Sequence, residues 1–287
     1  MAFRLDQIKT GLQSFAIVLL FMPIGHALMV LNERIFEHYK LSGAFAIGML
    51  GVFTLAAGIS KYKNKEIATL LGFLAGVLIW TGWVEFSFVW IAEKLHVAPY
   101  YEHGEVATKP EYLVMMSSAG LLLSMLVYFG FSRTKCQFFN WFQKLAGMKE
   151  RIGKEGRPAK LVAMTTFVET IMILWTFYIV LLLVYDQDIA GDRHPATYIV
   201  AFGSLFLSIY LFLNLIKNYK FDYAIRYAVP TVNIFWKFVE VIGRWDLFKE
   251  IWVHPIEHWV ENTIILALLM GFTVYYLKEN RGLEAGR

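Results

Sequence analysis

The sequence predicts an all-α membrane protein, a polytopic bundle of seven or eight transmembrane helices. Hydrophobic residues make up 57% of the 287 residues and charged residues only 17%, whereas an ordinary soluble domain has about 25% charged residues. The mean hydropathy is +0.50. Several stretches also contain about 20 mostly apolar residues in a row, which is the length that a helix needs to cross a bilayer.

This composition excludes a disordered chain, a secreted disulfide-rich scaffold and a nucleic-acid-binding module. The single cysteine, Cys136, cannot form a disulfide within the chain. No internal repeat or long linker interrupts the sequence. We therefore expect one integral membrane domain over residues 1–287.

Seven stretches qualify clearly as spans. They cover residues 12–32, 42–60, 67–92, 111–132, 161–185, 196–216 and 259–277. The first is interpreted as a retained helix rather than a signal peptide, because Asn32 and Glu33 stand where a small-residue cleavage site would be.

An eighth stretch, 228–243, is doubtful. It is short and carries Asn233, Lys237 and Glu240, so it either crosses inside the bundle or lies along the interface. Lys237 and Arg244 lie within one helical turn of Glu240, and we expect the three charges to neutralise one another.

The distribution of Lys and Arg predicts the orientation. If the eighth stretch crosses, both termini are cytoplasmic, and 19 of the 27 basic residues lie inside. With seven spans the C-terminal tail would lie outside the cytoplasm, and the basic residues would be divided less clearly between the two sides. We therefore favour eight spans.

Eight basic residues follow the fourth span, between Arg133 and Lys160. The first part of this loop, Cys136–Leu145, has apolar residues at helical spacing, which indicates either an amphipathic helix on the cytoplasmic bilayer surface or a plain loop.

Histidines and carboxylates gather on the predicted outer face. The positive-inside rule depletes outer loops of Lys and Arg, which explains the acidic residues there but does not explain the histidines. Together they form a metal-ligand set suited to Zn or Fe. The third span ends in a Glu93-x-x-His96 pair, which could hold an ion from one helix. His254 and His258 lie four residues apart at the start of the last span, where we expect His254 to be the N-cap. These four residues are the predicted metal ligands.

The His254-x-x-x-His258 spacing resembles part of the zinc site in membrane hydrolases of the alkaline ceramidase and adiponectin-receptor kind. Those enzymes hold zinc with three histidines and have Asp and Ser nearby. The resemblance covers these two histidines only, and no predicted span contains an Asp.

Two carboxylates are the candidates for proton transfer. Glu85 lies in the third predicted span among aromatic residues, without a basic residue nearer than Lys94. A charge at membrane depth costs at least ~2.5 kcal/mol, so such residues tend to be paired or functional. Glu257 lies between His254 and His258. We predict both glutamates as catalytic acids or bases.

Three functions fit the sequence. The first is a metal-dependent membrane enzyme acting on a lipid or other hydrophobic substrate. The second is a non-enzymatic anchor or assembly subunit of a respiratory or other membrane complex, with haem b on His26 or with a quinone. The third is an ion-coupled transporter that uses Glu85 and Glu169. In each case we expect a multi-pass protein of a cell membrane, of the bacterial inner-membrane kind, in contact with lipids and not with nucleic acid.

Overall fold

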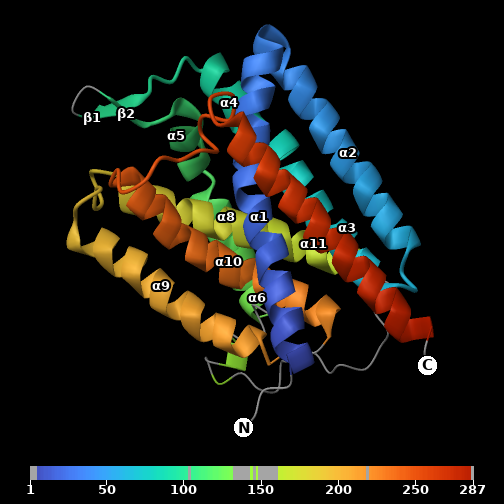
Figure 1. Cartoon of the computed structure of the whole chain (residues 1–287). Coiled ribbons are helices and arrows are strands. Elements are labelled where there is room, and N and C mark those ends of the chain that lie inside the picture. Colours follow the sequence, from blue (N-terminus) through green and yellow to red (C-terminus); the bar gives the residue numbers. More distant parts are fainter. Residues whose placement is uncertain are drawn as a thin grey trace. The chain divides into compact units, whose positions relative to one another are not determined.

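The computed structural model describes residues 5–102, 105–131, 143–144, 147, 161–217 and 220–285. It is helical apart from one short antiparallel hairpin, β1 (Tyr100–Glu102) and β2 (Glu105–Thr108). The all-α prediction is therefore confirmed (Figure 1). The predicted surface helix at Cys136–Leu145 lies outside the described residues, except for Gln143 and Lys144.

The helices follow the predicted spans, several of them with different bounds. They are α1 (Leu5–Phe36), α2 (Lys40–Ser60), α3 (Lys65–Ile79), the π-helical turn η2 (Trp80–Glu85), α4 (Phe86–Lys94), α5 (Pro110–Met116), α6 (Ala119–Phe131), α8 (Val162–Tyr185), α9 (Pro195–Leu215), α10 (Phe221–Arg244) and α11 (Trp259–Ala285). A 3₁₀ turn, Glu37–Tyr39, separates α1 from α2.

The helices group into two compact units. Unit 1 contains Met1–Glu37 and Ile199–Arg287, and unit 2 contains His38–Tyr198.

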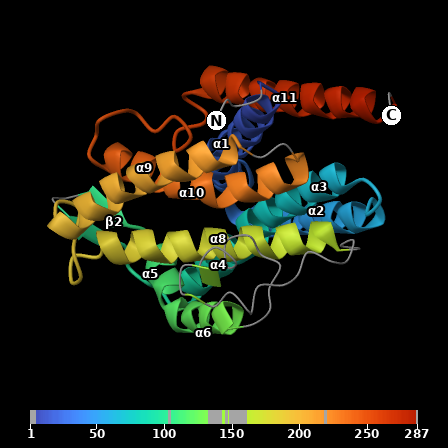
Figure 2. The ribbon, with the colours of Figure 1, turned by 90° about the horizontal axis from the view of Figure 1, so that it is seen from below.

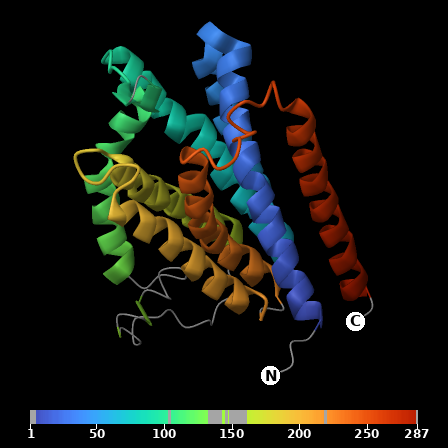
Figure 3. The same cartoon turned by 60° about the vertical axis from the view of Figure 1, so that its left-hand side comes forward.

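In unit 1, α1 packs against both α10 and α11, and Figure 3 shows α11 running beside α1. Gly11 allows α1 to approach the backbone of Ile216 closely, since a Cβ at this glycine would lie 2.7 Å from the Ile216 Cα. Phe15 of α1 packs edge-on against Phe212, with ring centroids 4.9 Å apart. Helix α10 is longer than predicted because its polar first turns lie outside the apolar run that marked the doubtful span.

In unit 2, α2 and the α3–η2–α4 segment form an antiparallel pair held together by glycines, and α8 packs against α3 (Figure 2). A Cβ at Gly58, Gly51 or Gly48 would overlap Leu71, Ile79 or Trp83, respectively. Small residues let the two backbones approach closely, as they commonly do between membrane helices. The pairing brings the start of α2 to the end of α4, where Lys40 forms an ion pair with Glu93.

The fourth predicted span is broken. Helices α5 and α6 are bent by 46° at Ser117 and Ser118. The two serine hydroxyls donate to the carbonyl oxygens of Val114 and Met115 at 2.6 and 2.7 Å, and such bonds compete with the helical backbone ladder. The Ser118 hydroxyl also accepts from the Trp175 indole of α8 at 2.8 Å.

Four helical segments of the described chain are long and apolar enough to cross a membrane: Gln7–Ser60, Lys65–Lys94, Val162–Tyr185 and Pro195–Leu215. The bent α5–α6 pair makes a fifth if it counts as one span, and Trp259–Tyr275 is a shorter apolar helix. These helices make the chain a membrane-embedded protein. The count of seven or eight crossings stays a prediction.

Candidate functional site

A cluster of polar side chains lies between α1 and α10 in unit 1. His26 Nε2 of α1 is 3.3 Å from Glu240 Oε1 of α10, and the two side chains are only 21% and 20% exposed. The indole of Trp236, one turn before Glu240, donates to the same carboxylate oxygen at 2.6 Å. Lys237 is 4% exposed and close enough to Glu240 for their charges to interact. We call these four residues, together with Glu250, the His26–Glu240 cluster.

Aromatic rings hold this cluster in place. The Trp236 ring stacks on His26, with centroids 6.2 Å apart and planes 22° apart. The Trp236 ring also contacts Trp252, with centroids 4.8 Å apart, in the segment between α10 and α11. Because Trp236 and Glu240 are one helical turn apart, one face of α10 presents both the indole donor and its acceptor.

Glu250 belongs to the cluster because Gly243 leaves room for it. A Cβ at Gly243 would overlap the Glu250 carboxylate oxygen, so this glycine lets the side chain lie directly against α10. The sharp turn that leads there passes through Asp246, whose backbone has φ 58°, a left-handed conformation that Asp tolerates better than most residues.

The pKa of Glu250 is shifted towards neutral pH. Its pKa is raised to about 7, mainly by burial and then by the negative charge of Glu240, with a smaller contribution from Asp246. His26 and Arg244 act in the opposite direction. A carboxyl group that titrates near pH 7 suits proton uptake and release.

We expect Glu250→Gln to stabilise the protein above pH 7. A free glutamate has a pKa of about 4.3, so the folded protein binds more protons than the unfolded chain between that value and about 7. Stability is therefore lost as the pH rises through this window, and the loss is complete above it. Glutamine removes the loss, which we put at about 1–2 kcal/mol because solvent screens this partly exposed side chain.

Thermal unfolding in detergent between pH 5 and 8 measures this effect. Glu257→Gln is the matched control, since it changes an exposed glutamate of the same connecting segment. Parallel pH profiles for wild type and Glu250→Gln would contradict the raised pKa.

Glu85 lies in a second buried polar cluster, in unit 2. It is 4% exposed and accepts a hydrogen bond from the Trp80 indole at 3.0 Å. Both residues belong to η2, and single π turns within helices often occur at functional sites. The Trp80 ring contacts Tyr178 of α8 at 5.4 Å. The sequence indicated a carboxylate within an apolar stretch, and the Glu85 side chain is buried in the protein, but the π turn and the indole partner were not predicted.

The structure does not support the predicted metal site. Among the described residues, no group of three or more His, Cys, Asp or Glu side chains is arranged to hold a metal ion. Glu93 forms an ion pair with Lys40. His96 lies beyond the end of α4 with φ 52°, so the two residues do not share one helical face as expected.

The other half of the predicted metal site is also arranged differently. Helix α11 begins at Trp259, so His254 is not its N-cap, although the His258 N–H donates to the His254 carbonyl at 3.0 Å. His258 Nδ1 lies 3.4 Å from Glu261. His254 and Glu257 are exposed.

His26, the predicted haem ligand, has another neighbour. Its Nε2 atom, which is a usual ligand atom for haem iron, faces Glu240. A haem would have to displace this contact.

The sequence singled out His26 and Glu240 separately but missed their pairing. Glu240 was expected to be neutralised within its own helix. Its charge does interact with that of Lys237, but the carboxylate also lies against His26 of α1. Glu250 was not singled out at all. A signal was present in the doubtful span, because a polar stripe on an otherwise apolar helix needs partners from a neighbouring helix.

No protein-family model, curated protein or solved structure matches this chain.

Proposed function

We propose that this chain is an ion-coupled membrane transporter whose coupling ion is the proton, bound at the His26–Glu240 cluster. The observation that carries the proposal is the His26–Glu240 pair itself. Two titratable side chains from different helices meet at 3.3 Å in the interior of unit 1. Ionisable residues within membrane segments typically mark ion and proton pathways.

The chemistry of the cluster fits proton binding. Histidine changes its charge near physiological pH, and the pKa of Glu250 is about 7. A proton that arrives at Glu250 would weaken the repulsion between this carboxyl group and Glu240, and it would change the charge balance around His26 and Lys237. Charge changes of this kind bias a two-state element in a transporter.

Broken helices in unit 2 support the same class. Transporter sites are typically built from discontinuous helices, whose interruptions place polar groups at membrane depth. The α3–α4 segment is interrupted by η2, which carries buried Glu85, and the α5–α6 segment is bent at Ser117 and Ser118. Buried Glu111 lies in the first turn of α5. These interruptions were not predicted from the sequence, because neither coincides with a pair of prolines or glycines.

The proposal includes the finer topology. We propose eight crossings with both termini in the cytoplasm, in a membrane of the bacterial inner-membrane kind. Gln7–Ser60 is 54 residues long, about twice what one crossing requires. Helix α10, too polar for a lone span, would cross with its polar stripe turned toward α1.

In the described part of the chain no group of His, Cys, Asp or Glu side chains supports the metal-dependent enzyme, and the His26 Nε2 atom that would bind a haem faces Glu240. The transporter is therefore the function that the geometry supports best.

Proton flux into liposomes tests the proposal. The purified chain is reconstituted with a pH-sensitive dye inside the vesicles and exposed to a pH gradient, alone and with panels of amino acids, sugars, nucleosides and carboxylates. We expect proton entry that one solute class accelerates, and we expect Glu240→Gln to reduce it at least tenfold while Glu261→Gln leaves it unchanged. Equal proton entry in wild-type, Glu240→Gln and empty vesicles would contradict the proposal.

A further inference from the structure

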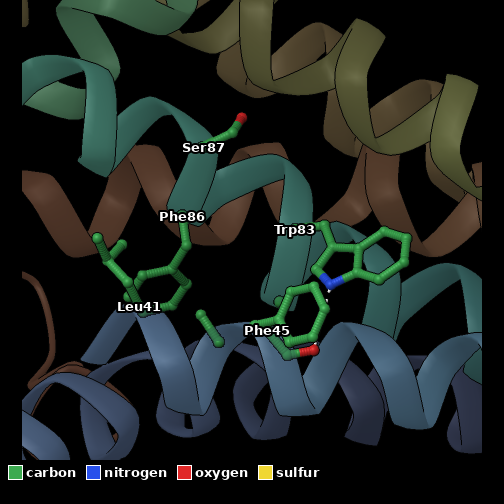
Figure 4. Close-up of a pocket in the computed structure, with 7 residues that line it drawn as sticks. Leu41, Phe45, Trp83, Phe86 and Ser87 are labelled. Atoms are coloured by element: carbon green, nitrogen blue, oxygen red, sulfur yellow. Dashed lines mark hydrogen bonds between the residues drawn. The ribbon is translucent and has the colours of Figure 1, made fainter. Parts of the chain in front are cut away.

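An apolar groove opens on the surface of unit 2 between the first turns of α2 and the η2–α4 segment (Figure 4). Its volume is about 300 Å³, at the lower end of the range for small-molecule sites. The side chains that define it are Leu41, Ala44 and Phe45 of α2, and Trp83, Phe86 and Ser87 of the facing segment.

The π turn and one glycine create this groove. Gly82 lies so close to α2 that a Cβ would overlap the Gly48 nitrogen and the Ala44 carbonyl oxygen. The next residue, Trp83, extends along α2, stacks on Phe45 at 6.0 Å and donates its indole N–H to the Phe45 carbonyl at 3.2 Å. The groove therefore has a floor of small residues and an aromatic wall fixed by a hydrogen bond.

The lining selects a hydrocarbon ligand. Its two side-chain donors already have acceptors, since Trp83 donates to Phe45 and the Ser87 hydroxyl donates to the Val84 carbonyl at 2.6 Å. A polar ligand would lose its hydrogen bonds to water without gaining replacements here. Both walls belong to segments apolar enough to cross a membrane, so the groove opens where lipid chains are the available apolar molecules.

Charged residues lie at one end of the groove. Lys40 precedes Leu41 directly, and its ion pair with Glu93 joins the start of α2 to the end of α4. Lys94 lies over the ring of Trp90 at 5.1 Å, and Trp90 is 47% exposed. An exposed tryptophan beside lysines is typical of the membrane–water interface. Lys40 and Lys94 place two cationic side chains at this end, which suits a phosphate group.

We propose that this groove binds one acyl chain of a membrane phospholipid, with the lipid phosphate near Lys40 and Lys94. The bound chain fills the space between α2 and α4 and shields the aromatic wall. This lipid site depends on residues of unit 2 only. The experiments that test it are therefore independent of those that test proton coupling at the His26–Glu240 cluster.

Photo-crosslinking tests the site directly. The full chain is placed in nanodiscs that contain a phosphatidylglycerol with a diazirine on one acyl chain, and the labelled peptides are mapped by mass spectrometry after irradiation. We expect residues 41–45 and 82–87 to be labelled several-fold more than the exposed apolar face of α6. Equal labelling of the groove and α6 would show only bulk lipid contact and would overturn the proposal.

A substitution that fills the groove distinguishes a specific lipid-binding site from general exposure to lipid. Ser87→Trp fills the groove from its exposed side, whereas Ser124→Trp makes the same change at an exposed α6 serine whose hydroxyl also bonds a helical carbonyl. We expect Ser87→Trp to lower groove labelling at least fivefold and Ser124→Trp to leave it unchanged. If Ser87→Trp does not give a monodisperse protein, Ser87→Leu serves the same purpose. Undiminished labelling of residues 41–45 in the folded variant would overturn the proposal.

The headgroup contribution is measured with the same label. Lys40→Gln and Lys94→Gln together should weaken labelling by the phosphatidylglycerol probe when unlabelled phosphatidylcholine competes. Labelling that is insensitive to both lysines would contradict the proposed phosphate position.

Discussion

Gly72→Leu is expected to unfold unit 2 or to lower its free energy of unfolding by about 3 kcal/mol, the upper end for overpacking a well-packed site. Gly72 is buried in α3, and a Cβ there would overlap the carbonyl oxygen and the Cα of Ala163 in α8. These are backbone atoms, so no side chain can rotate away. The helices must separate, which also disturbs the nearby contact between Gly76 and Thr170.

The matched control is Gly120→Leu in α6 of the same unit. Nothing lies within 4 Å of a Cβ at Gly120, and replacing an exposed helical glycine should be neutral or stabilise the helix by up to about 1 kcal/mol. Thermal unfolding in detergent, followed by size-exclusion chromatography, compares the two variants. Similar melting temperatures for both would show that α3 and α8 do not pack as closely as described.

Glu240→Leu is expected to destabilise unit 1 by about 3 kcal/mol, as when one partner of a buried charge pair is removed. The substitution leaves the Trp236 indole without its 2.6 Å acceptor. It also removes the negative charge beside His26 and the buried Lys237. Glu240→Gln should be milder than Glu240→Leu, because its side-chain oxygen can still accept from the indole.

A second His–Glu pair in unit 1 provides the control. His258 and Glu261 are 3.4 Å apart, but Glu261 is 51% exposed, and exposed ion pairs contribute at most about 1 kcal/mol. Glu261→Leu should therefore change the unfolding free energy little. Chemical denaturation of both leucine variants measures the difference, and equal effects would mean that burial does not strengthen the His26–Glu240 pair.

The positions of the helices follow from local properties of the sequence. Long apolar stretches predicted the helices that became α1, α2, α3–α4, α8, α9 and α11, because a run of about 20 apolar residues is stable only when it is buried in lipid or protein. The breaks were harder to predict. The bend at Ser117 and Ser118 depends on side-chain hydroxyls competing for helical carbonyls, and the same residues also occur in straight helices.

The candidate site could be predicted only in part. The position of Glu85 and Glu169 within apolar stretches indicated two buried carboxylates, and helical spacing indicated a polar stripe on α10. It failed for the metal ligands, because spacing within one helix does not determine whether the helix continues. Helix α4 ends before His96, and α11 begins after His258.

The sequence by itself determined that this is a helical membrane protein with charged residues inside its helices. Each apolar residue adds to the cost of exposing the chain to water, so this property can be added up along the sequence without knowledge of the fold. Only the tertiary structure decided which charges meet. His26 and Glu240 are 214 positions apart, and their 3.3 Å contact depends on how α1 and α10 pack. The close approach of Gly243 to Glu250 depends in the same way on the path of the segment after α10. Such contacts arise from the packing of whole helices, which no local pattern of residues encodes.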